Sequence, residues 1–488
     1  MPENIPILMY HDIGEQENPW CVSPQQFELQ MRWLKENGWK SISLSELKEK
    51  IEKEKFQSPN TKIPAEKLFV LTFDDGRKGV FTHALPLLRE LGFSATLFVV
   101  PHWINNPQEI TVEEKYSPFL NWEEVKELSC QGFEIGSHSF SHPDLTQLST
   151  HQITPELDSA EQEILEKLQR KVQHFCYPYG KYSSEIIEEI NKRYRTAVST
   201  QRGFAKNTGA YARQWVLRDT SLEHFQKLLQ KPKISLCMIV KNEEKFLDAC
   251  LCSVQNIVDE IIIIDTGSTD KTKEIAQKHH AKIYDFKWID DFAAARNFSL
   301  QQATGDWILI LDADEEITSE DHQIIKEATN SWEVEGFRIL TRNYSNDSTA
   351  QGWQPNLGLG QITKGLQGWF PSLKIRLFQN KKNILFQGKV HEIIPEHLLK
   401  NVASLPLSVH HYGALRGDLK EKTEMHLHLT QQKIANSDNA LSTTDLAKSY
   451  FELGVQYKNL GNFTESENAF RQSLTLDTTK INPLTNLS

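Results

Sequence analysis

Short apolar runs alternate with stretches of helical hydrophobic spacing along the first half of the chain. Continuous apolar runs of this length are typical of buried strands, whereas apolar positions three or four apart indicate helices. The alternation predicts a parallel α/β arrangement, either open or closed into a barrel. The predicted strands cover 7–10, 68–73, 96–100 and 134–136, and the predicted helices cover 25–37 and 159–171.

A break in this pattern divides the chain at Lys231-Pro232-Lys233, directly before a fresh apolar strand over 234–240. Proline disfavours helical geometry in the residue before it, so a proline between a helix and a strand is a boundary signal. The strand-helix alternation then resumes, and helical spacing replaces it beyond Arg416. The chain is therefore predicted to be a multidomain α/β protein with segments 1–230, 234–415 and 416–488.

The last segment has the spacing of a tetratricopeptide repeat, which is a helix-turn-helix unit with small residues at close contacts. A single repeat cannot bury a core, so this segment is expected to pack on the preceding domain or on another subunit. The residues that carry the spacing are Tyr450, Leu453, Gly454, Tyr457 and Phe470.

Composition and charge argue against some classes of function. A length of 488 residues predicts two or three domains. The net charge of −11 argues against a nucleic-acid partner and against a basic membrane-binding face. The amino terminus has no basic, apolar leader and the apolar runs are too short to span a bilayer, so a cytoplasmic location is expected. The six cysteines form no disulfide framework, and Cys250 and Cys252 are interpreted as structural thiols on different sides of a helix rather than as a metal site.

A first cluster of candidate catalytic residues begins with Asp74 and Asp75, which follow a buried strand and precede a glycine turn. His138 and His142, four residues apart, can meet on one turn or converge from a loop. Two imidazoles and one carboxylate make a three-ligand site with room for water, suited to Zn, Co, Fe or Ni. One aspartate would bind the metal and its neighbour would act as a base.

Three motifs in order resemble those of the polysaccharide deacetylase family (carbohydrate esterase family four, the nodulation deacetylase type): Thr-Phe-Asp-Asp-Gly at 72–76, His-Ser-Phe-Ser-His at 138–142 and Phe-Cys-Tyr-Pro-Tyr-Gly at 175–180. Met9-Tyr10-His11 and the helix before Gly38 are similar to the branch that acts on poly-N-acetylglucosamine. The resemblance covers about residues 5–230. It implies a distorted (β/α) barrel, with Asp75, His138 and His142 as metal ligands and Asp74 as base.

The chain departs from this family at two places. Cys176 stands where the family often has an arginine that orients the base, and Arg213 or Arg218 is expected to supply that charge. The family's late acid histidine has no secure match, because Leu222-Glu223-His224 lies in a helix-like stretch. Tyr179, in the third motif, is a further candidate site residue.

A second set of acids lies at the ends of three later strands. Glu243 follows the strand over 234–240, Asp265 ends the next strand, and Asp312 and Asp314 follow the third. Alternate carboxylates at a strand end can hold Mg or Mn and leave positions open for diphosphate oxygens. Asp265 is expected to contact a base or ribose in the crevice at the strand ends.

These segments resemble glycosyltransferase family two, whose members have the Rossmann-like GT-A fold. The resemblance rests on Val-Lys-Asn-Glu-Glu at 240–244, Asp-Thr-Gly-Ser-Thr-Asp at 265–270, Ala-Ala-Ala-Arg-Asn at 293–297 and Asp-Ala-Asp-Glu at 312–315. It implies that Glu243 and Asp265 face the nucleotide of a nucleotide-sugar donor. It also implies that Asp312 and Asp314 bind the metal and diphosphate.

Transferases of this family invert the anomeric centre, so a base must deprotonate the acceptor hydroxyl. Glu392, in Gly388-Lys389-Val390-His391-Glu392, resembles the acid of the family's His-Glu segment and is the candidate base. His411 is a candidate third metal ligand. The lack of flanking transmembrane segments argues against a processive synthase.

The leading interpretation is a bifunctional enzyme that removes an N-acetyl group and transfers a sugar to a carbohydrate or glycoconjugate acceptor. A second interpretation keeps only the transferase active, acting on a carbohydrate, protein or peptide, with the first domain as a non-catalytic carbohydrate-binding module. A third gives the main role to the helical tail, as a scaffold that recruits a protein or peptide acceptor.

Overall fold

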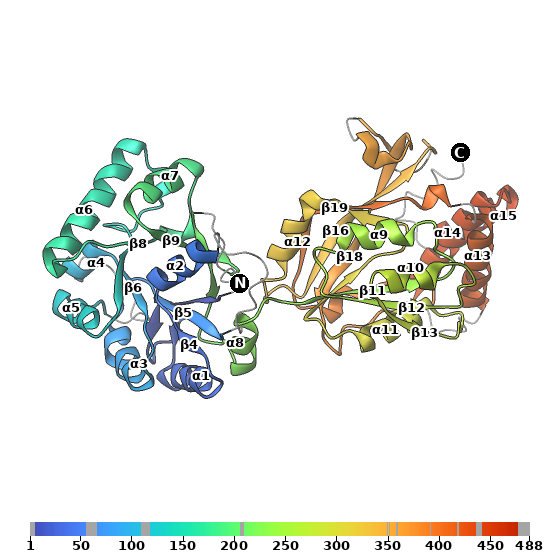
Figure 1. Cartoon of the computed structure of the whole chain (residues 1–488). Helices are drawn as coiled ribbons and strands as arrows, with labels where there is room; N and C mark the ends of the chain where they lie inside the picture. The colour runs from blue at the N-terminus through green and yellow to red at the C-terminus, as the bar shows by residue number, and fades with distance from the viewer. Residues whose placement is uncertain are drawn as a thin grey trace. The chain divides into compact units, whose positions relative to one another are not determined.

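The computed structural model describes residues 5–54, 66–108, 118–204, 209–348, 350, 352–357, 360–390, 392–416, 419–435 and 442–476. The chain forms two compact units, Met1–Lys231 and Pro232–Ser488 (Figure 1). Each unit has its own sheet and its own hydrophobic core.

The first unit is a closed barrel of parallel strands in the order β1-β10-β9-β8-β7-β6-β5, with β5 paired back to β1. Strand β4 (Lys40–Ser41) extends the sheet beyond β5, and β2 (Asp12–Ile13) pairs with β3 (Cys21–Val22) separately. The barrel strands are β1 (Ile7–Tyr10), β5 (Leu68–Phe73), β6 (Thr96–Val99), β7 (Glu134–Ser137), β8 (His174–Cys176), β9 (Thr196–Arg202) and β10 (Tyr211–Trp215).

Helices surround this barrel (Figure 1). Helix α1 (Pro24–Glu36) begins where the Ser23 side chain accepts a hydrogen bond from the Gln26 amide, and it buries Phe27, Met31 and Leu34. The other helices are α2 (Leu44–Glu54), α3 (Leu85–Leu91), α4 (Pro101–Asn105), α5 (Trp122–Cys130), α6 (Thr150–Leu168), α7 (Ser184–Arg193) and α8 (Leu222–Leu228).

The carboxyl ends of the barrel strands carry the polar residues. Every residue of β5 is buried, as expected for a parallel strand covered on both faces. Asp74 follows β5, His138 follows β7, and Cys176 is the last residue of β8. Because parallel strands end at the same face of a barrel, these residues of distant sequence meet there.

The second unit is built on a mixed sheet in the order β13-β12-β11-β14-β18-β16-β19-β15, with β17 (Gln354–Pro355) paired to β18. Strands β11, β12, β13 and β14 are parallel, and β18 then runs antiparallel to β14. The strands are β11 (Ile234–Val240), β12 (Glu260–Asp265), β13 (Lys282–Asp285), β14 (Trp307–Ile310), β15 (Glu315–Ile317), β16 (Gly336–Ser345), β18 (Gly368–Gln379) and β19 (Val402–His411).

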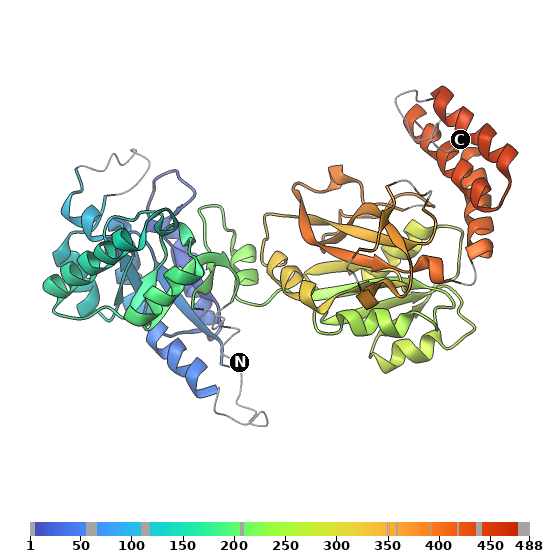
Figure 2. The same cartoon turned by 90° about the horizontal axis from the view of Figure 1, so that it is seen from above.

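Helices α9 (Leu247–Val254), α10 (Thr272–Lys278), α11 (Phe292–Gln302) and α12 (His322–Ala328) accompany this sheet. The tail follows as α13 (Leu419–Ala435), α14 (Thr443–Asn459) and α15 (Phe463–Leu476), a group of adjacent helices in both views (Figures 1 and 2). A Cβ atom on Gly454 of α14 would lie 2.6 Å from the Phe470 ring of α15, so the helices approach closely there. The predicted architecture of a barrel, a Rossmann-like α/β domain and a helical tail is confirmed.

Candidate active sites

Asp75, His138 and His142 lie together at the carboxyl end of the barrel. Their ligand atoms lie within 4.8 Å of one another, and His138 Nε2 is 3.7 Å from Asp75 Oδ1. His138 Nδ1 donates a hydrogen bond to the Cys176 carbonyl at 2.8 Å, which leaves the Nε2 lone pair facing Asp75. Burial lowers the pKa of His142 to about 3, so this imidazole is neutral and able to bind a metal at neutral pH.

Asp74 is buried beside these residues and is held by Arg213 from β10. The two guanidinium nitrogens of Arg213 donate to the two carboxylate oxygens of Asp74 at 2.7 and 2.6 Å. Burial alone would raise the pKa of Asp74, but Arg213 holds that pKa well below its usual range. The Cys176 Sγ lies 3.5 Å from Asp74 and 3.2 Å from Arg213, so the thiol occupies the space beside the ion pair.

The other candidates of the first site have different surroundings. Arg218 donates to the carbonyls of Gln16 and Cys21, so the expectation that it could serve Asp74 is wrong and Arg213 takes that role. His224 lies in the first turn of α8, where its amide is bonded to the Ser221 cap. Tyr179 is 60% exposed, and its ring contacts His142 with centroids 4.6 Å apart.

His11 is a site residue to which sequence reasoning gave no role. It follows β1, and its Nδ1 is buried without a hydrogen-bond partner among the described residues. Burial lowers the pKa of His11, while the charges of Asp75 and Asp74 act to raise it, so the imidazole lies within electrostatic reach of both aspartates. The available signal was the motif Met9-Tyr10-His11, whose histidine directly follows the first barrel strand.

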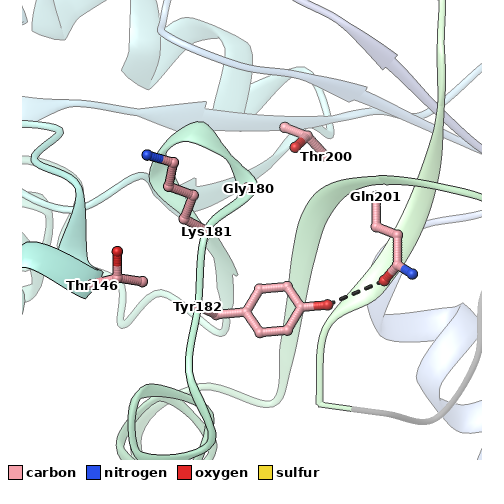
Figure 3. A pocket seen from close by; sticks show the side chains of 6 residues that line it. All are labelled: Thr146, Gly180, Lys181, Tyr182, Thr200 and Gln201. Carbon is pink, nitrogen blue, oxygen red and sulfur yellow. Dashed lines mark hydrogen bonds between the residues drawn. The ribbon is translucent and has the colours of Figure 1, made fainter. Parts of the chain in front are cut away.

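An open polar pocket of about 430 Å³ is lined by Gly180, the residue after Tyr179, and by its neighbours (Figure 3). The Thr200 hydroxyl donates to the Tyr179 carbonyl, and the Tyr182 hydroxyl donates to Gln201 at 3.1 Å. Aromatic faces and hydroxyl or amide groups of this kind suit a sugar ring. The pocket is lined by Thr146, Gly180, Lys181, Tyr182, Thr200 and Gln201.

In the second unit, Arg296 joins Asp312 to Glu392. Its guanidinium is buried in α11 and pairs with Asp312, while its Nε donates to Glu392 at 3.2 Å. Asp312 follows β14, and Glu392 comes from the segment between β18 and β19. The structure therefore brings together the candidate base and the first acid of the Asp-Ala-Asp motif, with an arginine between them. His391 lies outside the described residues.

Arg416 binds the other acids of this site. Its guanidinium pairs with Asp314 and, at 2.8 Å, with Glu243. His411 Nε2 lies 3.5 Å from Asp314, and His411 Nδ1 bonds the Asn343 side chain at 2.8 Å. Burial would raise the pKa of Asp314, but His411 and Arg416 hold it well below its usual range.

Asp265 is held by the backbone of the turn that follows β12. Its carboxylate accepts hydrogen bonds from the amides of Gly267 and Ser268, and its side chain is buried. Thr266, the next residue, lines a cavity of this unit. These hydrogen bonds fix the carboxylate in the turn after β12. The expected contact of Asp265 with a nucleotide stays a prediction.

Glu243, Asp312 and Glu392 line a cavity of about 910 Å³ in the second unit. Its polar side carries Glu243, Arg296 and Arg416, and its apolar side includes Leu373 and Ile393. Met425 and His426 of the tail helix α13 also line it, and the His426 ring contacts Phe292 of α11 with centroids 5.6 Å apart. The helical tail thus contributes directly to this cavity.

Two family models match separate parts of the chain. Residues 61–198 match the model of the polysaccharide deacetylase family, and residues 235–391 match the model of glycosyl transferase family 2. Among the described residues, no helix is long and apolar enough to cross a membrane.

Several curated proteins are similar to parts of the chain. A TPR repeat-containing protein of Synechococcus elongatus is 37% identical over 39% of this chain and 44% of its own length. YxkH of Bacillus subtilis, provisionally named a polysaccharide deacetylase, is 29% identical over 43% of this chain and 70% of its own length. The glycosyltransferase SunS of a B. subtilis prophage is 29% identical over 42% of this chain and 45% of its own length. The chain thus spans less than half the length of the first and the last of these relatives.

Among solved structures, the Streptococcus pyogenes deacetylase PplD in complex with acetate covers 46% of this chain and 98% of its own. That match has 25% sequence identity and a TM-score of 0.41.

Proposed function

The chain joins a polysaccharide deacetylase domain to a family 2 glycosyltransferase domain, and from this premise we propose that it is a bifunctional carbohydrate-active enzyme. Its first unit would remove the acetyl group from an N-acetylated sugar, and its second would transfer a sugar from a nucleotide donor with inversion. The observation that carries the proposal is the cluster of Asp75, His138 and His142 beside the ion-paired Asp74.

The donor set of the first site fits a divalent transition metal. One carboxylate and two imidazoles suit Zn, Co, Fe or Ni, and the hydrogen bond from His138 Nδ1 leaves Nε2 as the ligand atom. Such an ion would lower the pKa of a water molecule and polarise the acetamide carbonyl. The residues that would hold it are Asp75, His138 and His142.

Asp74 and His11 are the proposed base and acid. Asp74 stays ionised because of Arg213, so it can accept the proton of the attacking water through an oxygen lone pair that the arginine does not use. His11, whose Nδ1 has no other partner among the described residues, would protonate the leaving amine nitrogen. The pocket lined by Gly180 would hold a neighbouring sugar of a longer substrate.

The carboxylates of the second site are paired with arginines, so this site is less ready to bind a metal ion than the first site is. Asp314 and His411 offer an oxygen and a nitrogen 3.5 Å apart, but Arg416 and Arg296 pair with Asp314 and Asp312. Mg or Mn held by Asp312, Asp314 and His411 would neutralise the diphosphate leaving group. The two arginines would turn from the carboxylates toward the phosphate oxygens when the donor enters.

Glu392 is the proposed base for the acceptor hydroxyl. It lines the cavity together with Asp312, and Arg296 holds its carboxylate there by a hydrogen bond of 3.2 Å. A carboxylate kept ionised and oriented by an arginine can accept a proton as the acceptor oxygen attacks the anomeric carbon.

The first test measures acetate release from N-acetylglucosamine oligomers after the protein is loaded with each transition metal. Asp75→Ala is expected to abolish both metal binding and acetate release, whereas Asp74→Asn should retain the metal and lose at least about 100-fold in rate. His11→Asn should lose rate and retain the metal. Bound metal without acetate release in the unmodified protein would favour the non-catalytic carbohydrate-binding interpretation of this unit.

The second test screens nucleotide sugars with carbohydrate, protein and peptide acceptors. Asp314→Asn and Glu392→Gln are expected to abolish transfer and leave acetate release unchanged. Asp314→Asn should also weaken binding of the nucleoside diphosphate with Mn²⁺, whereas Glu392→Gln should leave that binding intact. Transfer that survives Asp314→Asn would contradict the assignment of this site.

A further inference from the structure

A third cluster of metal-binding side chains lies on α9 and α10 of the second unit. Asp248 and Cys252 are four residues apart on α9 and therefore share one face of that helix. His279 directly follows α10, and its Nε2 lies 2.8 Å from Asp248 Oδ1. The ligand atoms of the three residues lie within 4.8 Å of one another. We propose that Asp248, Cys252 and His279 form a zinc-type site that clamps α9 to α10.

The donor types select the ion. A thiolate and an imidazole favour Zn²⁺ and related borderline-soft ions such as Co²⁺ and Cd²⁺, while Mg²⁺ and Mn²⁺ favour oxygen ligands. Three protein ligands leave a fourth tetrahedral position for water. The cluster therefore differs in metal preference from the oxygen-rich Asp312 and Asp314 in the same unit.

The geometry needs only small side-chain movements. Ligands about 2.0 to 2.3 Å from zinc in a tetrahedral site lie about 3.6 Å apart. The three donor atoms are within 4.8 Å of one another before any ion is added. Cys252 is exposed and Asp248 is 47% exposed, so both can change rotamer, whereas His279 is only 10% exposed and fixes the position of the site.

The two helices held by this cluster carry the loops of the proposed donor site. Helix α9 follows Glu243 by a few residues, and the Glu243 amide donates to the Thr272 hydroxyl in the first turn of α10 at 2.7 Å. On the opposite side of α9, Cys250 is buried and its Sγ lies 3.4 Å from the Asp312 carbonyl. A metal ion bound on the face of α9 opposite Cys250 would therefore hold α9 and α10 together without entering the cavity.

The ammonium group of Lys278 would compete with a metal ion for Asp248. Its Nζ lies 3.1 Å from the same Asp248 oxygen that His279 contacts. A bound divalent ion would displace this ammonium group from Asp248, because the two cations compete for one carboxylate. Removal of the lysine charge should therefore strengthen metal binding, whereas removal of a ligand should weaken it.

Zinc protection of cysteines from alkylation tests the site in the full chain. The first-site ligands are removed by Asp75→Ala and His142→Ala, and iodoacetamide labelling is followed by peptide mass spectrometry with and without Zn²⁺. Cys130, an exposed thiol at the end of α5, serves as the reference within the same molecule. Saturating zinc is expected to slow labelling of Cys252 at least about tenfold and to leave Cys130 unchanged, because the thiolate is both ligand and nucleophile. No slowing, or equal slowing at both cysteines, would overturn the site.

Three variants then test its composition. Asp248→Asn and His279→Gln should each raise the zinc concentration for half-protection of Cys252 at least about tenfold, since even outer partners of a metal site contribute that much. Lys278→Ala should lower that concentration. If this zinc concentration is unchanged in both ligand variants, the Cys252 thiol binds zinc without Asp248 and His279. If it rises in Lys278→Ala, the lysine does not compete with zinc for Asp248. Either result would overturn the proposal.

Discussion

The buried pair of Asp74 and Arg213 explains how the first site accommodates a cysteine where an arginine is expected. Cys176 is too short to reach around the carboxylate, but Arg213 arrives from β10 and bonds both of its oxygens. The guanidinium also contacts the Cys176 thiol at 3.2 Å, so the small side chain makes the room that the arginine fills. The charge is the same as in the expected arrangement, and only its strand of origin differs.

Loss of the Arg213 charge is expected to impair both stability and rate. Breaking a buried ion pair from one side costs about 3 to 5 kcal/mol of unfolding free energy, so Arg213→Met should destabilise the first unit by that order. Because the folded pKa of Asp74 lies below its unfolded value, the pair stabilises the protein above about pH 4 and loses this effect as the pH falls. In Arg213→Met the pKa of Asp74 rises, so the acidic limb of the acetate-release profile should move to higher pH.

Arg213→Lys, which keeps one charge, should show a smaller shift in both measurements. Thermal unfolding and the pH dependence of the rate together check the prediction. A profile that does not move in Arg213→Met would show that Asp74 is not the group that limits the rate at low pH.

Arg416 is predicted to compete with a metal ion for Asp314. Arg416→Gln leaves a buried carboxylate without its cation and should lower the free energy of unfolding of the second unit by about 3 kcal/mol. Mn²⁺ can then occupy the vacated partner position, so the rise in melting temperature on adding Mn²⁺ should be larger in Arg416→Gln than in the unmodified protein. Arg471→Gln, which removes an exposed pair with Glu467 on α15, is the control. An equal rise in all three proteins would contradict this competition.

Sequence motifs identified the acids and histidines of both sites better than they identified the arginines. Acids after apolar strands have a local signal, because the strand end fixes where their side chains go. Arg296 and Arg416 reach their partners across elements that are distant in sequence, and no local spacing encodes such a pairing. The hydrogen bonds that Asp265 accepts from the amides of its own turn have no local sequence signal either, since a carboxylate at a strand end can face a ligand or its own backbone amides.

At the scale of elements, the sequence predicted where the strands of the first unit lie, but its residue pattern did not predict that their sheet closes into a barrel. Strands β1 and β5 lie where the apolar runs indicated, because parallel strands buried on both faces have continuous apolar sequence. Closure of the barrel depends on the pairing of β1 with β10 across two hundred residues, which residue patterns do not specify. The resemblance to a known family, rather than periodicity, supplied that part of the prediction.

The tail repeat depends on close contact between α14 and α15 at Gly454. A Cβ atom there would lie 2.6 Å from the Phe470 ring, so Gly454→Val should force the helices apart and cost about 1 to 3 kcal/mol. Limited proteolysis should then cut the tail helices faster than in the unmodified protein. Gly461→Ala is the control in the adjacent turn, where no atom lies within 4 Å of the added Cβ although its positive φ adds some strain. Equal cleavage in both variants would contradict the packing argument.

At the scale of the whole molecule, the junction between the second α/β domain and the tail contributes residues to the proposed donor site. Arg416 stands at the predicted boundary, yet it binds Asp314 and Glu243, and Met425 and His426 line the same cavity. A chain that ends after Arg416 should bind a nucleoside diphosphate with Mn²⁺ more tightly than one that ends after Leu415. Both should lose transfer to the acceptor, and both should keep acetate release. Calorimetric titration of the two shortened chains checks the first expectation, and equal affinities would contradict it.

Strand β10 has a consequence for how the protein is made. Asp74 leaves the ribosome about 140 residues before Arg213, and the ring of strands cannot close until β10 pairs with β1. Such long-range pairing is slow, because the intervening chain must be ordered first. A nascent chain that ends before β10 would lack both the strand that closes the ring and the counterion of Asp74, so we expect it to form neither the complete barrel nor the proposed site. Completion of the barrel and pairing of the proposed base with its arginine are thus expected to be a single event in biosynthesis.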